Sequence, residues 1–137
     1  MLAAWHNWFA IPLAMILASL SLLHAYWALG GRWGVEFTIP VVEGRRAFTP
    51  SPLATWAVCG LLALAVGLVA RRSPLIGIWG LAVVFLLRAI GEFRMVGLFK
   101  SIKDTDFARW DTRLYSPLCL LIALLAAAVA TSSNQDR

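Results

Sequence analysis

The sequence predicts an all-α integral membrane protein of one domain, folded as an antiparallel four-helix bundle. Three observations support this prediction. The 137 residues are 61% hydrophobic, with a mean hydropathy of +0.78, whereas soluble domains are roughly 45–50% apolar. The apolar residues form separate segments, and most of these are long enough for membrane helices, which need roughly 17–25 residues. Polar residues, glycine and proline separate these segments.

We predict helices at about residues 8–29, 53–70, 75–99 and 114–131 of the chain. The first should end at Gly30-Gly31, because glycine commonly ends helices. The fourth apolar segment is short, so its helix is expected to begin earlier, near Asp111 or Leu114. Serine is favoured at the N-cap of a helix, and proline is favoured at the first helical position. Ser-Pro pairs therefore indicate helix starts, and three of them come just before apolar segments: Ser51-Pro52, Ser73-Pro74 and Ser116-Pro117.

The predicted connections differ in length and in charge. Loop 1 (30–52) is long, residues 71–74 form a tight turn, and loop 3 (100–116) mixes charges with aromatic residues, which suggests a short interfacial helix. Loops 1 and 3 share one side of the membrane. Cytoplasmic loops carry excess Lys and Arg, so a simple count places these loops in the cytoplasm. Their side carries Arg32, Arg45, Arg46, Lys100, Lys103, Arg109 and Arg113, and the other carries Arg71, Arg72 and Arg137.

Charged residues inside the third apolar segment are the strongest indication of function. A charge costs roughly 2.5–3.5 kcal/mol at the centre of a membrane helix. Such residues therefore indicate a pocket, a relay or a polar clamp between helices. Arg88 and Glu92 are four residues apart and would share a helix face, where an intrahelical salt bridge is an alternative to a site. Arg94 would point elsewhere, and we expect it to be a structural charge that reaches the interface.

Depth along the helices brings further polar residues to the same half of the bundle. His24 lies about 7.5 Å, and Glu92 about 10 Å, from the loop-side ends of their predicted helices at 1.5 Å per residue. Asp111 would start the fourth helix on that side. A histidine beside a carboxylate can serve acid–base catalysis, although a lone histidine is more commonly a satisfied core residue. The residues expected to line a half-buried pocket are His24, Trp27, Arg88, Glu92 and Tyr115.

The leading functional hypothesis is binding of a small amphiphilic or lipid-like molecule in this pocket. The alternatives are a membrane-embedded enzyme that uses His24 with Glu92 or Asp111, and an accessory subunit of a membrane complex or a small transporter. The net charge of +5 is explained by basic residues that face lipid headgroups, which argues against nucleic acid. Cys59 and Cys119 lie in apolar segments without metal-ligand spacing. We therefore expect no metal and no cofactor, and membrane lipids or a membrane protein as partners.

Several ordered motifs resemble a known family. They are HAYWALGG (24–31), GRRAFTP (44–50), LRAIGEFRMVG (87–97), TDFA (105–108), DT (111–112) and YSPLCLLI (115–122). They are similar to those of the small bacterial membrane proteins grouped as domain of unknown function 3995, which often have Asp in place of Glu92. The resemblance implies a four-helix fold in the bacterial cytoplasmic (inner) membrane with cytoplasmic N- and C-termini, opposite to the charge count. It implies no activity.

Overall fold

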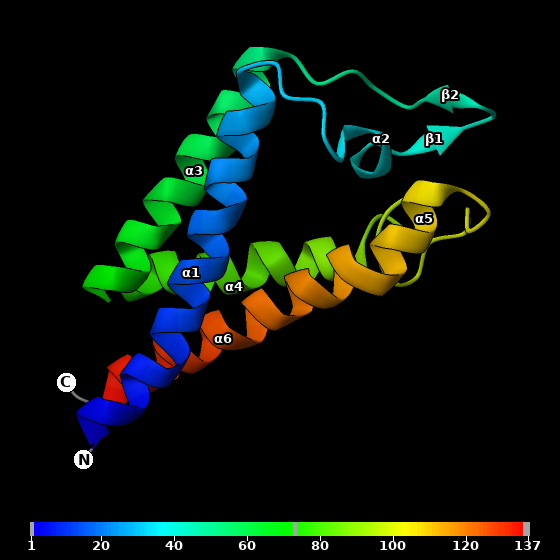
Figure 1. Ribbon diagram of the computed structural model, residues 1–137. Coiled ribbons are helices and arrows are strands. Elements are labelled where there is room, and N and C mark those ends of the chain that lie inside the picture. Colours follow the sequence, from blue (N-terminus) through cyan, green and yellow to red (C-terminus); the bar gives the residue numbers. More distant parts are fainter. Residues whose placement is uncertain (1, 73, 136–137) are drawn as a thin grey trace.

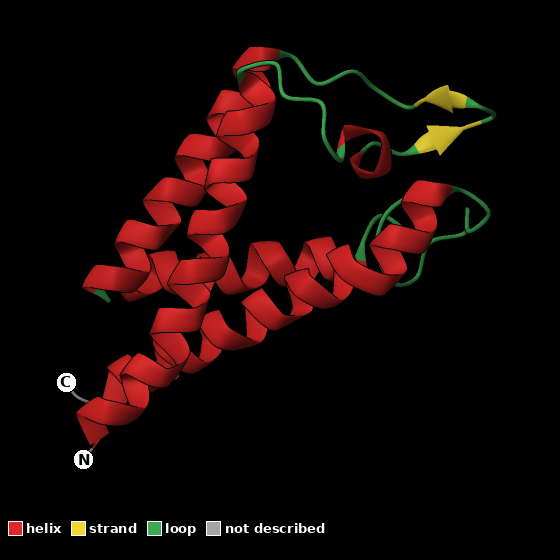
Figure 2. Ribbon diagram, viewed as in Figure 1, coloured by secondary structure: helices red, strands yellow, loops and turns green. Residues whose placement is uncertain are grey.

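The computed structural model describes residues 2–72 and 74–135, and these are mostly helical (Figures 1 and 2). Ser73, a predicted cap, and Arg137, a counted charge, lie outside this part. The elements in chain order are α1 (Leu2–Ala28), α2 (Val35–Thr38), β1 (Val41–Val42), β2 (Arg45–Arg46), α3 (Pro52–Arg71), α4 (Leu75–Ile90), α5 (Asp106–Trp110), the π-helical turn η1 (Asp111–Tyr115) and α6 (Ser116–Gln135).

Three helical segments are long and apolar enough to cross a membrane. They are residues Trp8–Ala28, Pro52–Arg71 and Asp106–Asn134, and α4 is a shorter apolar helix of 16 residues. An α-helix pairs most of its backbone N–H and C=O groups internally, which a lipid environment requires. The protein is therefore of the multi-pass membrane type.

The long helices are arranged as two pairs. Helix α1 packs along α3, α4 packs along α6, and α1 also contacts α6. Figure 1 shows that the pairs meet near the chain termini and diverge towards the loops, so that they form two arms. The buried core lies where they meet and includes Leu13, Leu17, Ile78, Ile122 and Val129. This arrangement does not confirm the predicted antiparallel four-helix bundle.

Helix α4 is shorter than the sequence predicted. It ends at Ile90 rather than at Phe99, because the chain turns back at two glycines with positive φ, Gly91 (86°) and Gly97 (95°). A Cβ atom on Gly97 would lie 2.3 Å from the carbonyl oxygen of Ile90. The prediction of a helix over 75–99 is therefore wrong beyond Ile90, since these glycines permit a turn.

The last membrane segment begins earlier than its apolar residues. Thr105 caps α5 by accepting a hydrogen bond from the amide of Ala108 at 3.1 Å, and the helical turns then continue through η1 into α6. The predicted helix in loop 3 is therefore present, joined to the fourth helix. Ser116 is buried within this run and does not begin a helix after a loop. Ser51, by contrast, caps α3 as predicted, through the amide of Ala54 at 3.1 Å.

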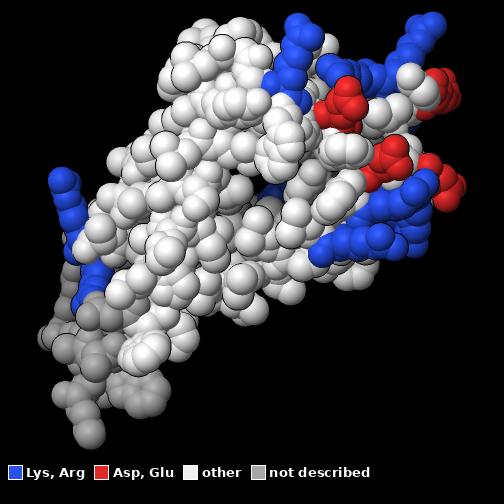
Figure 3. Space-filling view, in the orientation of Figure 1, with Lys and Arg blue, Asp and Glu red and all other residues white. Residues whose placement is uncertain are grey.

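Loop 1 extends from the α1–α3 arm towards the other arm. It contains α2 and an antiparallel hairpin in which Val41 pairs with Arg46 and Val42 with Arg45, and α2 contacts α5. Figure 3 shows that charged side chains gather at this loop end and that a smaller basic group lies towards the opposite end. Between them the visible surface is mainly uncharged, which suits a membrane.

Candidate polar site at the loop end of α4 and α6

Asp111 is the centre of a buried polar cluster. Its side chain is fully buried. It accepts a hydrogen bond from Nη2 of Arg88 at 3.0 Å, one from Nζ of Lys100 at 3.1 Å, and one from the amide of Gly97 at 2.8 Å. The carboxylate therefore joins the end of α4, the returning segment 91–100 and η1. We call Arg88, Lys100 and Asp111 the charge cluster.

Lys100 is the member of the charge cluster that sequence reasoning missed. Its side chain is 1% exposed, and Nζ also donates to the carbonyl oxygen of Gly97 at 2.9 Å and to Oγ1 of Thr112 at 2.6 Å. The sequence placed Lys100 among the loop charges. Its position directly after an apolar segment could have indicated burial. The turn at Gly91 and Gly97, which buries Lys100, was not predicted.

Glu92 lies outside the hydrogen bonds of the charge cluster. It lies beyond the end of α4, is exposed, and accepts hydrogen bonds through Oε1 from the amides of Met95 and Val96. It therefore stabilises the turn after α4, and Arg88 pairs with Asp111 instead. Arg94 is also exposed.

His24 and Trp27 lie on the other arm. Nδ1 of His24 is 2.7 Å from the carbonyl oxygen of Leu20, and the His24 and Trp27 rings meet edge-on with centroids 5.1 Å apart. The indole N–H of Trp27 donates to the carbonyl oxygen of Trp33 at 2.8 Å. Within the described residues, no hydrogen bond or ion pair joins His24, Glu92 and Asp111 to one another.

Tyr115 connects the α4–α6 arm to loop 1. Its hydroxyl donates to the carbonyl oxygen of Phe37 at 3.1 Å, and its ring lies 6.1 Å from that of Phe107. Phe37 in turn contacts Trp110, with ring centroids 6.0 Å apart. Tyr115 therefore holds loop 1 over the loop end of α6, which sequence reasoning did not foresee.

An apolar groove lies between the two arms, next to α1 and α6. It is a shallow groove, open to the surface, with a volume of about 330 Å³, and it is lined by Met15, Ile16, Ser19, Leu20 and Leu118. Ile16, Leu20 and His24 are spaced four apart and therefore share a face of α1. His24 therefore lies one turn beyond the groove residue Leu20 on this face, and it is not among the residues that line the groove.

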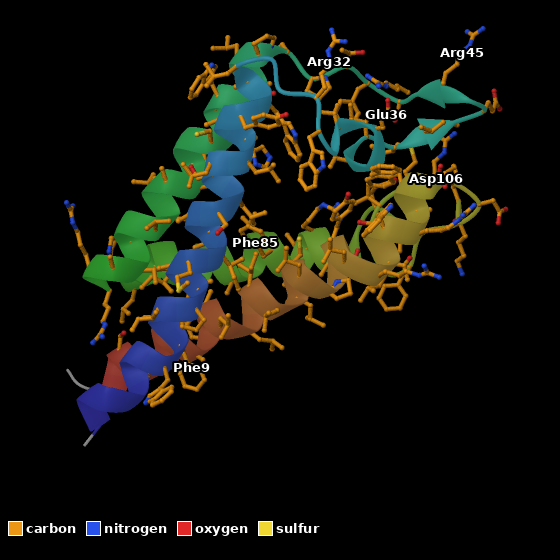
Figure 4. All side chains as sticks on the ribbon, in the orientation of Figure 1. Phe9, Arg32, Glu36, Arg45, Phe85 and Asp106 are labelled. Carbon is orange, nitrogen blue, oxygen red and sulfur yellow. The ribbon has the colours of Figure 1, made fainter. Side chains whose placement is uncertain are left out.

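The figures show the setting of these residues. Figure 3 shows a hollow between the arms with a Lys or Arg side chain at its floor. In Figure 4, Arg32, Glu36, Arg45 and Asp106 lie at the loop end, whereas Phe9 lies towards the other end and Phe85 near the point where the pairs meet. The labelled charged side chains thus lie at the loop end, and the two labelled phenylalanines lie away from it.

The two cations of the charge cluster differ in exposure. Both are paired with the buried Asp111. Arg88 is 35% exposed and offers planar N–H donors suited to carboxylate or phosphate oxygens. In the described part of the chain, no three His, Cys, Asp or Glu side chains gather as metal ligands would.

Fold and site define a multi-pass membrane protein with two diverging helix pairs and a buried charge cluster at the loop end of the α4–α6 pair. The chain belongs to the family described as "Protein of unknown function (DUF3995)", whose model matches residues 17–126. The match includes α3, α4 and the charge cluster, together with the last part of α1, residues 17–28. Comparisons with curated proteins and with solved structures found no match.

Proposed function

We propose that this protein binds a small amphiphilic or lipid-like molecule in the space between its two helix arms. The observation that carries this proposal is the combination of an apolar groove of about 330 Å³ with a partly exposed cation, Arg88, in the charge cluster. An amphiphile needs both environments, because its tail is apolar and its headgroup is polar. Ligand sites are characteristically apolar clefts with a few placed polar groups.

The two environments are separated by a distance that suits one molecule. Leu118, in the groove, lies about 10 Å along the helix from Asp111 at 1.5 Å per residue. The headgroup would lie near Arg88, and the tail would extend past Leu118 between α1 and α6. His24 and Trp27 would line the α1 side, and Tyr115 would hold loop 1 above the headgroup.

We further propose that all four helices cross the bacterial cytoplasmic membrane as antiparallel segments, with the N- and C-termini in the cytoplasm. The family resemblance supports this placement, and α4 would be the shortest segment. At 1.5 Å per residue its 16 residues span about 24 Å, less than a hydrocarbon core of about 30 Å. The returning segment 91–100 would complete the crossing, with its polar groups satisfied by Asp111 and Glu92.

The enzyme alternative receives less support from the geometry. It needs His24 beside Glu92 or Asp111, whereas Glu92 caps a turn and Asp111 is paired with Arg88 and Lys100. An accessory subunit or a small transporter would instead be indicated by a partner protein or a second copy that remains bound after extraction.

Native mass spectrometry of gently extracted protein tests the proposal. Wild type should retain a defined small amphiphile. Ser19→Trp should lose it, because the indole would fill the groove from an exposed position on α1. Ile76→Trp is the matched control, since Ile76 is 81% exposed on α4 and does not line the groove. A bare wild-type protein, or equal retention by Ser19→Trp, would contradict the proposal.

A further inference from the structure

We infer that the headgroup of this amphiphile carries an anionic oxygen group, a phosphate or a carboxylate, which pairs with Arg88. The inference rests on the proposed function and names the chemical class of its ligand. It follows from the charges, the free donors and the depth of the charge cluster.

The charge cluster has one more cation than anion. Arg88 and Lys100 are both paired with Asp111, so one carboxylate faces two positive groups. Glu92 does not supply the missing charge, because it is exposed and its Oε1 accepts the amides of Met95 and Val96. Since an uncompensated charge away from water is costly, an anionic group at this place would stabilise the protein.

Arg88 has donors left for such a group. Its Nη2 donates to Asp111, whereas its Nη1 is buried and has no hydrogen-bond partner among the described residues. The side chain as a whole is still 35% exposed, so a ligand can approach Arg88 from its exposed side, although it would have to displace the atoms that cover Nη1 to bond there. Its fork of N–H groups suits the paired oxygens of phosphate or carboxylate. Lys100, at 1% exposure, is already enclosed by protein oxygens and is the less accessible of the two cations.

The depth of Arg88 matches the headgroup of a lipid in the loop-side leaflet. Arg88 lies about 20 Å along α4 from its start at Leu75, within a hydrocarbon core of about 30 Å. An arginine side chain can reach towards the interface from that depth. Leu118, which lines the apolar groove, follows Asp111 along the helix, so the groove lies farther from the loop end than the charge cluster does. The headgroup would therefore lie on the loop side and the tail towards the middle of the membrane, which is the orientation of a lipid in that leaflet.

Binding of three defined probes to detergent-solubilised protein tests the inference. The probes are phosphatidylglycerol, diacylglycerol with the same acyl chains, and inorganic phosphate. Wild type should bind phosphatidylglycerol at least about tenfold more tightly than diacylglycerol, which is the lower end of what a charge-assisted hydrogen bond provides. Arg88→Gln should remove this preference. Arg113→Gln, at an exposed position in η1, is the control that should retain it.

The outcomes separate the inference from the proposed function. Equal binding of diacylglycerol and phosphatidylglycerol by wild type, or an unchanged preference in Arg88→Gln, would overturn the anionic headgroup but leave amphiphile binding intact. Displacement of phosphatidylglycerol by millimolar inorganic phosphate would assign the site to a soluble anion and overturn the lipid assignment. Failure to bind either lipid would remove the proposed function itself. If Arg88→Gln does not fold, Arg88→Lys should fold and keep at least part of the preference, and its complete loss would contradict simple charge pairing.

Discussion

Single residues decide how the loop end of this protein is held together. Asp111 is fully buried and joins Arg88, Lys100 and the amide of Gly97. Removing one member of a buried ion pair leaves an uncompensated charge, which costs far more than losing a surface pair. Substitution of Asp111 should therefore lower stability most. Substitution of the exposed Glu92, which the sequence had indicated as a site residue, should lower it less.

Asp111→Asn should destabilise the protein by about 3–5 kcal/mol, because both cations lose their anionic partner. Thermal unfolding in detergent, followed by circular dichroism, measures the effect. Asp106→Asn is the control, since its pair with Arg109 is 3.6 Å long and exposed, and it should cost less than about 1 kcal/mol. Similar losses in the two variants would show that Asp111 is not a buried partner of the cations.

Glu92→Gln should change stability little, within about 1 kcal/mol. Glutamine keeps a side-chain oxygen that can accept hydrogen bonds from the amides of Met95 and Val96. The same thermal unfolding measurement checks it. If Glu92 were instead the partner of Arg88 within a longer α4, this variant would be as damaging as Asp111→Asn.

At the scale of elements, the sequence located the apolar helices better than their ends. Long apolar segments and the Ser51 cap identified α1, α3 and most of α4 and α6. The end of α4 could not be predicted, because the residues after Ile90 continue the apolar pattern and the turn depends on the positive φ of Gly91 and Gly97. The burial of Lys100 depends on this turn and could not be predicted either. Arg88 and Asp111, by contrast, could be recognised from the sequence as charged residues at a similar depth in the membrane.

Gly97→Ala should destabilise the turn by about 1–3 kcal/mol, because alanine is strained at a φ of 95°. In addition, the Cβ atom of the alanine would meet the carbonyl oxygen of Ile90. Hydrogen exchange should show faster exchange of the Gly97 region and of the amide of Leu98, which bonds to Ala89. Gly60→Ala is the matched control, since nothing lies within 4 Å of its Cβ position, and it should not lower stability. Equal behaviour of the two alanine variants would contradict the turn.

On the scale of the whole molecule, two helix pairs share one core and diverge towards a charged loop end (Figure 1). The sequence predicted the convergence of polar residues at that end from depth alone. It could not predict their division between two arms, since depth along a helix says nothing about which helices pack together. Loop 1 reaches from one arm to the other and contacts it through α2, α5 and the hydroxyl of Tyr115.

Tyr115→Phe should loosen loop 1 without unfolding the helices, because it removes the hydrogen bond to Phe37 and keeps the ring contact with Phe107. Hydrogen–deuterium exchange should increase in residues 32–48 while α3 and α6 stay protected. Thr38→Val, which removes a hydrogen bond local to α2, is the control and should affect only that helix. Unchanged exchange in Tyr115→Phe would show that another contact holds the loop.

The most direct test of amphiphile binding between the arms is photolabelling with a fatty-acid probe that carries a photoreactive group in its chain, in lipid nanodiscs. Peptide mass spectrometry locates the labels, and excess unlabelled fatty acid gives the specific fraction. We expect saturable labelling of Met15, Ser19 and Leu118, which line the groove. Labelling that is as strong and as saturable at Leu53 and Ile76, which are 80% and 81% exposed elsewhere on the helices, would contradict a site between the arms.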